Sequence, residues 1–221
     1  MDYLQQLIER YPQLSGNRNT ILNAYHLLSE TFEAGGKLLA AGNGGSAADA
    51  DHIVGELMKD FVKKRPLGDD FIAKLRGINP EHAEYIGKNI QQGLSAISLS
   101  AHTALITACI NDIGGNIIYA QQVYGYGEAG DVFLGISTSG NAKNVLYAMI
   151  TAKAKNMKTI ALTGGSGGAI ANIADTAIIV PETETYKIQE LHLPIYHALC
   201  LMIEERFFQV SCGDTPARGD A

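Results

Sequence analysis

Residues 37–46 read KLLAAGNGGS, and this stretch decides the fold that the sequence predicts. A short apolar run, residues 37–41, stops abruptly at a glycine-rich loop, and a helical pattern follows through about Phe61. A short apolar run that is bounded by glycines is typical of a buried strand. The three parts together predict a strand, a tight loop and a helix.

The same pattern recurs along the chain. Residues 131–136 (DVFLGI) lead into the loop 137–141 (STSGN), residues 158–162 (KTIAL) lead into 163–168 (TGGSGG), and residues 176–180 (TAIIV) stop at Pro181. Residues 96–99 (AISL) fit either a strand or a buried helical turn. Continuous apolar strands that alternate with helices predict a parallel sheet covered on both faces. In such sheets ligands bind beyond the carboxyl ends of the strands, where these loops fall.

Outside the sheet, three segments are expected. Residues 1–36 form an N-terminal helical arm of two helices, broken at residues 12–17 and ended by a glycine pair. Residues 37–210 form the α/β domain, whose last helix covers about residues 185–210. The tail, residues 211–221, is expected to be disordered.

The composition excludes several classes of protein. The 221 residues carry 17 basic and 23 acidic side chains, a net charge of −6, which argues against broad nucleic-acid binding. No apolar run is long enough to cross a bilayer, so no membrane association is expected. Residues 1–6 lack the features of a secretory signal, and three widely spaced cysteines give no disulfide framework. We expect a cytoplasmic protein.

The loop at residues 137–141 offers three hydroxyls, Ser137, Thr138 and Ser139, before a predicted helix. Hydroxyls and backbone N–H groups at the positive end of a helix dipole are what a phosphate needs. Helix capping by one hydroxyl is the simpler alternative, but three hydroxyls exceed what a cap needs. This loop therefore predicts phosphate binding.

The first loop, residues 42–47, fits the dinucleotide fingerprint G-x-G-x-x-A. That fingerprint also needs an acidic residue at the end of a second strand about 20 residues later. Residues 60–68 contain no strand, only a basic turn (KKRP), so NAD binding is rejected. Close backbone approach to a smaller sugar phosphate fits the loop better.

Two pairs of polar side chains are candidates for chemistry. His52 and Glu56 lie four residues apart on one helix face, where they could share a metal, act as an acid/base couple, or form an ordinary surface hydrogen bond. Gln189 and His197 lie on the last helix about 12 Å apart, so sharing one ion would demand long side-chain reach. A buried core histidine is the alternative for His192 and His197.

Taken together, the loops 42–47 and 137–141, the pair His52 and Glu56, and the segment 188–192 (IQELH) resemble the sugar isomerase (SIS) domain family, and most closely its phosphoheptose isomerase branch. The resemblance implies a three-layer αβα sandwich around a five-stranded parallel sheet. It also implies a homotetramer with active sites at subunit interfaces. A zinc ion would be held by four residues: His52, Glu56, Gln189 and His197.

The resemblance implies an activity as well. It is the conversion of sedoheptulose 7-phosphate to D-glycero-D-manno-heptose 7-phosphate through an enediol, metal-assisted, with Glu56 as base and His197 as its partner. The substrate would be bound by Asn43, Gly44, Gly45, Ser46, Glu56, Asn111, Asp112, Ser137, Thr138, Ser139 and Gln189. From the residues alone, Asn111 and Asp112 are equally well explained as turn formers. The alternatives are an isomerase of another phosphosugar and a non-enzymatic SIS protein, of the kind that regulates replication initiation.

The sequence departs from the family pattern in two places. Ala142 stands where the family usually has a hydroxyl. The stretch at about residues 67–110 looks about 25 residues longer than in the enzymes it resembles, and we expect short helices at residues 71–75 and 81–90. Long ordered connections are often functional, so this insert is a candidate lid or interface element.

Overall fold

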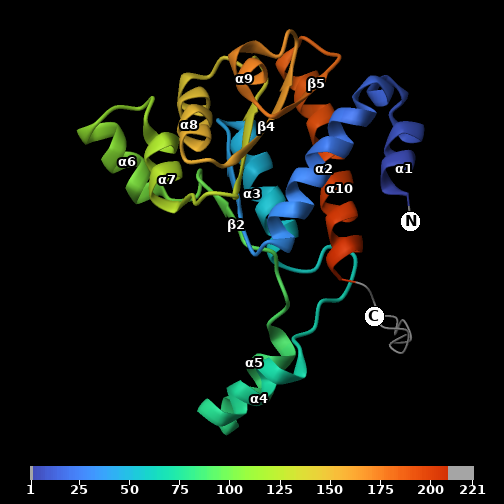
Figure 1. Ribbon diagram of the computed structural model, residues 1–221, viewed down its shortest axis with the longest axis vertical. Coiled ribbons are helices and arrows are strands. Elements are labelled where there is room, and N and C mark those ends of the chain that lie inside the picture. Colours follow the sequence, from blue (N-terminus) through green and yellow to red (C-terminus); the bar gives the residue numbers. More distant parts are fainter. Residues whose placement is uncertain (1, 209–221) are drawn as a thin grey trace.

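The computed structural model of the protein describes residues 2–208 and is built on five parallel strands. The strands are β1 (Leu38–Ala41), β2 (Ala96–Ser98), β3 (Val132–Ser137), β4 (Lys158–Gly164) and β5 (Thr176–Val180), in the order β2-β1-β3-β4-β5 (Figure 1). Every neighbouring pair is parallel. Because β1 lies between β2 and β3, the sheet reverses its winding there, and the loops after β1 and β3 flank this switch point.

Helices cover both faces of the sheet. Successive side chains of a strand point to opposite faces, and in β1 both sets are apolar, so both faces need a cover. Leu38 and Ala40 join one core with the helices α1 (Tyr3–Arg10), α2 (Arg18–Glu33), α3 (Gly45–Met58) and α10 (Thr185–Phe207) and the 3₁₀ helix η1 (Pro12–Asn17). Leu39 and Ala41 join a second core with α6 (Thr103–Asp112), α7 (Ile118–Tyr126), α8 (Lys143–Ala154) and α9 (Gly168–Ile173). The predicted three-layer α/β fold is confirmed.

The structure settles the ambiguous segments and moves some boundaries. Residues 96–98 form a strand, because they pair with Leu38–Ala40 of β1. The helix predicted through Phe61 ends at Met58, and the last helix ends at Phe207. The predicted disordered tail, residues 211–221, lies outside the described residues. Within residues 2–208, no helix combines the length and the apolarity needed to cross a membrane.

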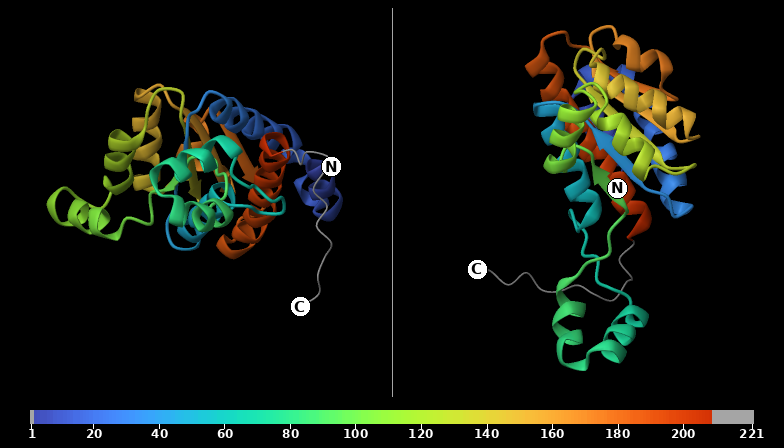
Figure 2. Two further views of the ribbon diagram at one scale, coloured as in Figure 1. Left: turned by 90° about the horizontal axis from the view of Figure 1, so that it is seen from below. Right: turned by 90° about the vertical axis from the view of Figure 1, so that its left-hand side faces the viewer.

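The expected insert contains a helical hairpin, α4 (Asp69–Ile78) and α5 (Pro80–Asn89), that projects away from the body of the molecule (Figures 1 and 2). Its two helices pack on each other, with Ala83 buried between them, and an isolated bridge joins Pro66 to Gln91 at its base. The hairpin fills only the first part of residues 67–110. The rest of that range contains β2, which belongs to the sheet, and most of α6.

Candidate functional site: a hydroxyl loop and an acid/base cluster

The glycine-rich loop after β1 is fixed against the N-terminal end of α8. The side-chain amides of Asn43 and Asn144 donate to each other, with both N···O distances 2.9 Å. The Tyr119 hydroxyl donates to the Gly42 carbonyl. The loop after β1 leads directly into α3, and the loop after β3 leads directly into α8. The contact between Asn43 and Asn144 therefore places the first turn of α3 beside the loop after β3.

The loop after β3 presents its hydroxyls without using them as a helix cap. Gly140 has a φ of 67°, and a Cβ there would collide with the Gly167 carbonyl oxygen, so this turn requires glycine. Ala142 is the N-cap of α8, with no capping bond from a side chain, and the Ser139 hydroxyl accepts only from the Asn141 amide in the described residues. The simpler capping alternative is therefore wrong. Ser137 is buried, Thr138 is half-buried and Ser139 is exposed at the rim.

Gln189 lies against the glycine-rich loop rather than near His197. A Cβ on Gly45 would be 2.5 Å from the Gln189 Nε2 atom, so the α10 side chain occupies the space that this glycine leaves open. The substrate-binding prediction for Gln189 is consistent with this place. The prediction that Gln189 shares an ion with His197 stays a prediction, since two turns of α10 separate them.

The predicted acid/base residues come together between α3 and α10. The His52 Nε2 atom lies 3.2 Å from the Glu56 Oε1 atom, and the His52 and His197 rings meet edge to face with centroids 5.0 Å apart. The Glu56 carboxylate is mostly buried, and its second oxygen receives the exposed Lys59 ammonium at 3.2 Å. Helix α10 runs alongside α3, so residues about 140 positions apart in sequence share one cluster.

Burial lowers the pKa of His197, the nearby His52 lowers it further, and the Glu56 carboxylate raises it. The result is an imidazole that is neutral near pH 7, so one of its nitrogens has a lone pair available. His192, by contrast, is fully buried in the core, and burial lowers its pKa to about 4. His192 is the core histidine that the sequence left open, whereas His197 belongs to the cluster.

Sequence reasoning missed two members of this cluster. Tyr196 places its hydroxyl 3.1 Å from the His52 Nδ1 atom and 3.2 Å from the Asp49 Oδ1 atom. Burial raises the pKa values of both Asp49 and Tyr196. The signal for Asp49 was available, since it precedes His52 by three residues on one helix face. Tyr196 had no such signal. It is next to His197 in the sequence, but consecutive residues on a helix point in different directions, so this position did not predict a contact with His52.

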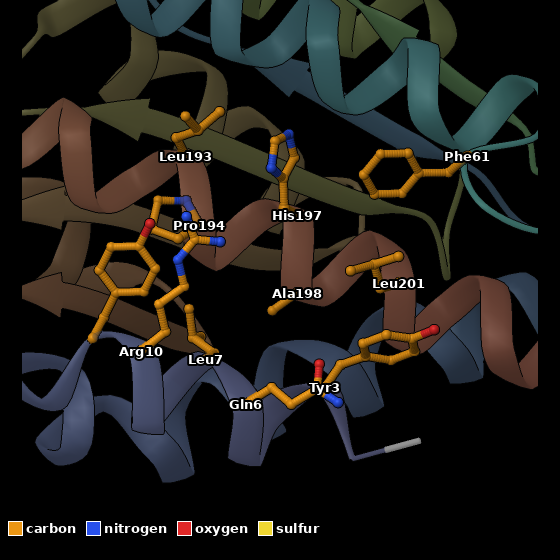
Figure 3. A pocket seen from close by; sticks show the side chains of 11 residues that line it. Tyr3, Gln6, Leu7, Arg10, Phe61, Leu193, Pro194, His197, Ala198 and Leu201 are labelled. Atoms are coloured by element: carbon orange, nitrogen blue, oxygen red, sulfur yellow. The ribbon is translucent and has the colours of Figure 1, made fainter.

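A pocket of about 430 Å³ lies beside this cluster. Figure 3 shows the side chains that line it. It lies between α1 and α10, with the His197 ring and Phe61 at one side and Tyr3, Gln6 and Arg10 at the other. Its lining contains none of the hydroxyls of residues 137–139. The pocket therefore adjoins the acid/base cluster, and it is not the place where the hydroxyls of residues 137–139 would bind a phosphate.

A buried ion pair fixes the C-terminal end of α3, the helix that carries His52 and Glu56. Arg65 donates to the Glu204 Oε1 atom at 2.9 Å and 2.7 Å, and the same guanidinium donates to the carbonyls of Glu56 and Leu57 at the end of α3. The Glu204 carboxylate also accepts from the backbone amides of residues 61–63. Both side chains are almost completely buried. This pair explains why α3 ends at Met58, because Arg65 binds the carbonyls that would otherwise continue the helix.

We expect Glu204→Gln to lower the free energy of unfolding by about 3–5 kcal/mol, since it leaves the buried Arg65 charge uncompensated. Urea denaturation followed by circular dichroism measures this loss. The matched control is Glu33→Gln, which breaks the exposed pair with Arg206 and should cost less than about 1 kcal/mol. Equal losses in the two variants would contradict a structural role for the buried pair.

Asn111 and Asp112 are not brought to either loop in the described chain. They form the exposed end of α6, where the Asn111 amide donates to the Asp112 carboxylate at 2.7 Å. Helix α6 packs on α7 at the outer edge of the molecule (Figure 1). Their predicted contact with substrate stays a prediction.

The hydroxyl loop and the acid/base cluster lie at opposite ends of α3. Glu56 is 11 residues beyond Gly45, which is about 16 Å along a helix that runs away from the loops. A seven-carbon sugar phosphate, with bonds of about 1.5 Å, spans about 10 Å from its first carbon to its phosphorus. This separation along the axis of α3 exceeds the length of one such molecule, which favours a site that a second chain completes.

Two family models, both described as SIS domain, match residues 79–202 and residues 2–96. A phosphoheptose isomerase of Helicobacter pylori (strain P12) is 41% identical over 194 residues, which is 88% of each chain. The chain belongs to the phosphoheptose isomerase branch of the SIS domain family.

Solved structures of this family have the same fold. The phosphoheptose isomerase from Francisella tularensis has a TM-score of 0.73 at 33% identity, covering 92% of this chain and 95% of that chain. The phosphoheptose isomerase from Neisseria gonorrhoeae has a TM-score of 0.70 at 34% identity, covering 91% of both chains. The resemblance that the sequence motifs indicated is confirmed across nearly the whole chain.

Proposed function

We propose that this member of the phosphoheptose isomerase family interconverts sedoheptulose 7-phosphate and D-glycero-D-manno-heptose 7-phosphate. The observation that carries the proposal is the cluster in which the Glu56 carboxylate lies 3.2 Å from the His52 ring, with His197 alongside. The relatives named phosphoheptose isomerase support the substrate class. Cytoplasmic location and a homotetramer are parts of the proposal.

The reaction moves one proton between the first two carbons of the sugar. Glu56 takes the proton from one carbon and returns it to the other, which suits a carboxylate that is mostly shielded from water. His197, neutral near pH 7, serves the oxygens of the same two carbons by giving and accepting a proton. The hydroxyls of residues 137–139 bind the phosphate, and this contact positions the reacting carbons.

The cluster fits a zinc ion in its chemistry. Two imidazoles and one carboxylate are common zinc ligands, and the His197 Nε2 atom is buried with no hydrogen-bond partner among residues 2–208. In that same part of the chain no three His, Cys, Asp or Glu side chains are already arranged as a metal site, so the donors would have to turn toward one point. Zinc would be held by His52, Glu56 and His197, with a Gln189 from a second chain as the fourth ligand, because the Gln189 of the same chain lies against Gly45 at the start of α3. The ion would supply positive charge near the sugar oxygens.

The site is proposed to form between two chains. The hydroxyl loop of one protomer would face the acid/base cluster of its partner, because α3 separates the two within one chain. The exposed edge of His52, with 42% of its side chain accessible, is open to such a partner. Interface assembly thus supplies the proximity that the single chain lacks.

Removal of one phosphate-binding hydroxyl should weaken substrate binding. We expect Thr138→Val, which keeps the shape of the side chain, to raise KM for the sugar phosphate about 10- to 100-fold with little change in kcat, because a hydrogen bond to a charged group is worth about 1.5–3 kcal/mol. Steady-state kinetics measure this split. Thr151→Val on α8 is the control, because within residues 2–208 its hydroxyl donates to the Tyr147 carbonyl and has no other hydrogen bond. A change in kcat alone would contradict a phosphate-binding role for Thr138.

The activity itself is tested by incubating the purified protein with sedoheptulose 7-phosphate and following the aldose product by NMR. Turnover supports the proposal, and fructose 6-phosphate and ribulose 5-phosphate serve as comparison substrates. Preferred turnover of a comparison substrate would assign a different phosphosugar. Binding of sugar phosphates without any turnover, in zinc-supplemented protein, would instead favour the regulator that the sequence analysis left open.

A further inference from the structure

A pair of asparagines joins the loop after β1 to the helix that follows the hydroxyl loop. Asn43 belongs to the glycine-rich loop, and Asn144 lies in the first turn of α8. The Nδ2 atom of each side chain donates to the Oδ1 atom of the other at 2.9 Å. Asn43 is exposed, whereas Asn144 is half-buried. A loop expected to bind a ligand is therefore held by a residue that lies outside both loops.

The backbone of α8 decides which way the two amides face. The backbone N–H of Val145 donates to the Asn144 Oδ1 atom at 3.0 Å. The oxygen of a side-chain amide accepts hydrogen bonds and its nitrogen only donates them, so Asn144 cannot exchange the two atoms without bringing N–H groups against each other. Because Asn144 is fixed in this way, only one orientation of the Asn43 amide allows both bonds to form.

Counting protons shows what the Asn43 amide can still offer to a ligand. Its Oδ1 atom accepts from Asn144, and the Tyr119 hydroxyl oxygen lies 3.4 Å from the same atom. Its Nδ2 atom has two protons. One of them is donated to Asn144, and no group within residues 2–208 accepts the other. The exposed amide of Asn43 therefore offers an N–H, which suits the oxygens of a phosphate or a sugar.

We propose that Asn144 is a positioning residue, which holds the Asn43 amide so that it presents an N–H to a bound sugar phosphate. Without Asn144 the Asn43 side chain would be free to rotate, and a ligand would have to immobilise it on binding. The cost of ordering one side chain corresponds to about 3- to 10-fold in affinity. The class of ligand rests on the proposed function. The orientation of the Asn43 amide does not, so it can be measured separately.

The first measurement is a ¹⁵N–¹H NMR spectrum of ligand-free protein labelled at its asparagine side chains, with the Asn43 signals assigned from an Asn43→Ala spectrum. In the wild type we expect one Nδ2 proton of Asn43 to be shifted downfield and to exchange slowly with water. Asn144→Ala should move this signal to the position of a free amide. Asn89→Ala, which removes an exposed amide that donates to the Tyr85 carbonyl, should leave the Asn43 signals unchanged.

The second measurement separates positioning from a general structural effect. Calorimetry gives the Kd of sedoheptulose 7-phosphate in a Glu56→Gln background, where turnover is slow. Asn43→Ala should weaken binding about 10- to 100-fold, the usual loss for a hydrogen bond to a charged group, and Asn144→Ala about 3- to 10-fold. Because Asn144 acts through Asn43, adding Asn144→Ala to Asn43→Ala should cause no further loss. Asn89→Ala should bind like its parent.

Two results would overturn the inference. One is a set of Asn43 signals that Asn144→Ala does not change. The other is an Asn144→Ala effect on Kd that is equally large with and without the Asn43 side chain, since Asn144 would then act on the loop or the ligand directly. Wild-type protein that shows the expected Asn43 signal yet neither binds nor turns over sedoheptulose 7-phosphate would refute the proposed function and leave the orientation of the amide standing.

Discussion

Glu56→Gln should lower kcat by a factor of about 10² to 10⁴, which is the contribution expected of a group that transfers a proton in the transition state. Glutamine keeps nearly the same shape and still accepts a hydrogen bond, but it cannot take a proton from carbon. Binding of sedoheptulose 7-phosphate, measured by calorimetry, should change only a few-fold, because the phosphate is held elsewhere. A coupled assay of heptose formation measures the turnover.

The control for this substitution is Glu30→Gln, at an exposed position on α2. It removes the same charge from the surface and should leave kcat unchanged. Near-wild-type turnover in Glu56→Gln would remove the carboxylate from the mechanism. Loss of binding together with turnover would instead make Glu56 a substrate ligand or a structural residue.

Much of the fold was predictable because its signals are local. Each apolar run that stops at glycine or serine became a strand of the parallel sheet, and parallel strands bring the loops after them to one edge. The i,i+4 spacing of His52 and Glu56 likewise predicted their contact. Resemblance to a known family added His197, whose partners lie about 140 residues away.

The rest of the site depends on packing between segments that are far apart in the sequence. The spacing of apolar residues along one segment does not show which other segment it packs on. Arg65 and Glu204 are 139 residues apart, and neither shows any pattern in the sequence that marks it as buried. Tyr196 reaches Asp49 and His52 only because α10 lies against α3. The hairpin of α4 and α5 was expected as two short helices, but its projection away from the body follows from its packing on itself.

The hydroxyl loop and the acid/base cluster lie at the two ends of α3, so a complete site would combine the loop of one chain with the cluster of another. We therefore expect that two inactive variants, one altered in each half, regain activity when they are mixed in one oligomer. Ser139→Asp places a negative charge at the rim of the phosphate loop and should abolish activity by repelling the phosphate. Glu56→Gln removes most of the activity by its effect on the other half of the site. If one protomer supplies the loop and its partner the cluster, some sites in a mixed oligomer contain neither substitution.

The expected size of the rescue follows from symmetry. With equal amounts of the two variants, half of the loops come from Glu56→Gln chains and half of the clusters come from Ser139→Asp chains. About one quarter of all sites are then intact, and slightly more once the unmixed oligomers are removed. Co-expression with two different affinity tags and purification over both yields only mixed oligomers. The control is co-expression of two differently tagged Glu56→Gln chains, which should stay inactive.

The turnover of these mixed oligomers tests most directly the claim that the hydroxyl loop and the acid/base cluster act on one sugar phosphate across a subunit interface. We predict about one quarter of the wild-type activity from two variants that are each inactive alone. Activity no higher than that of the two parents, in mixed oligomers of normal stability, would contradict it.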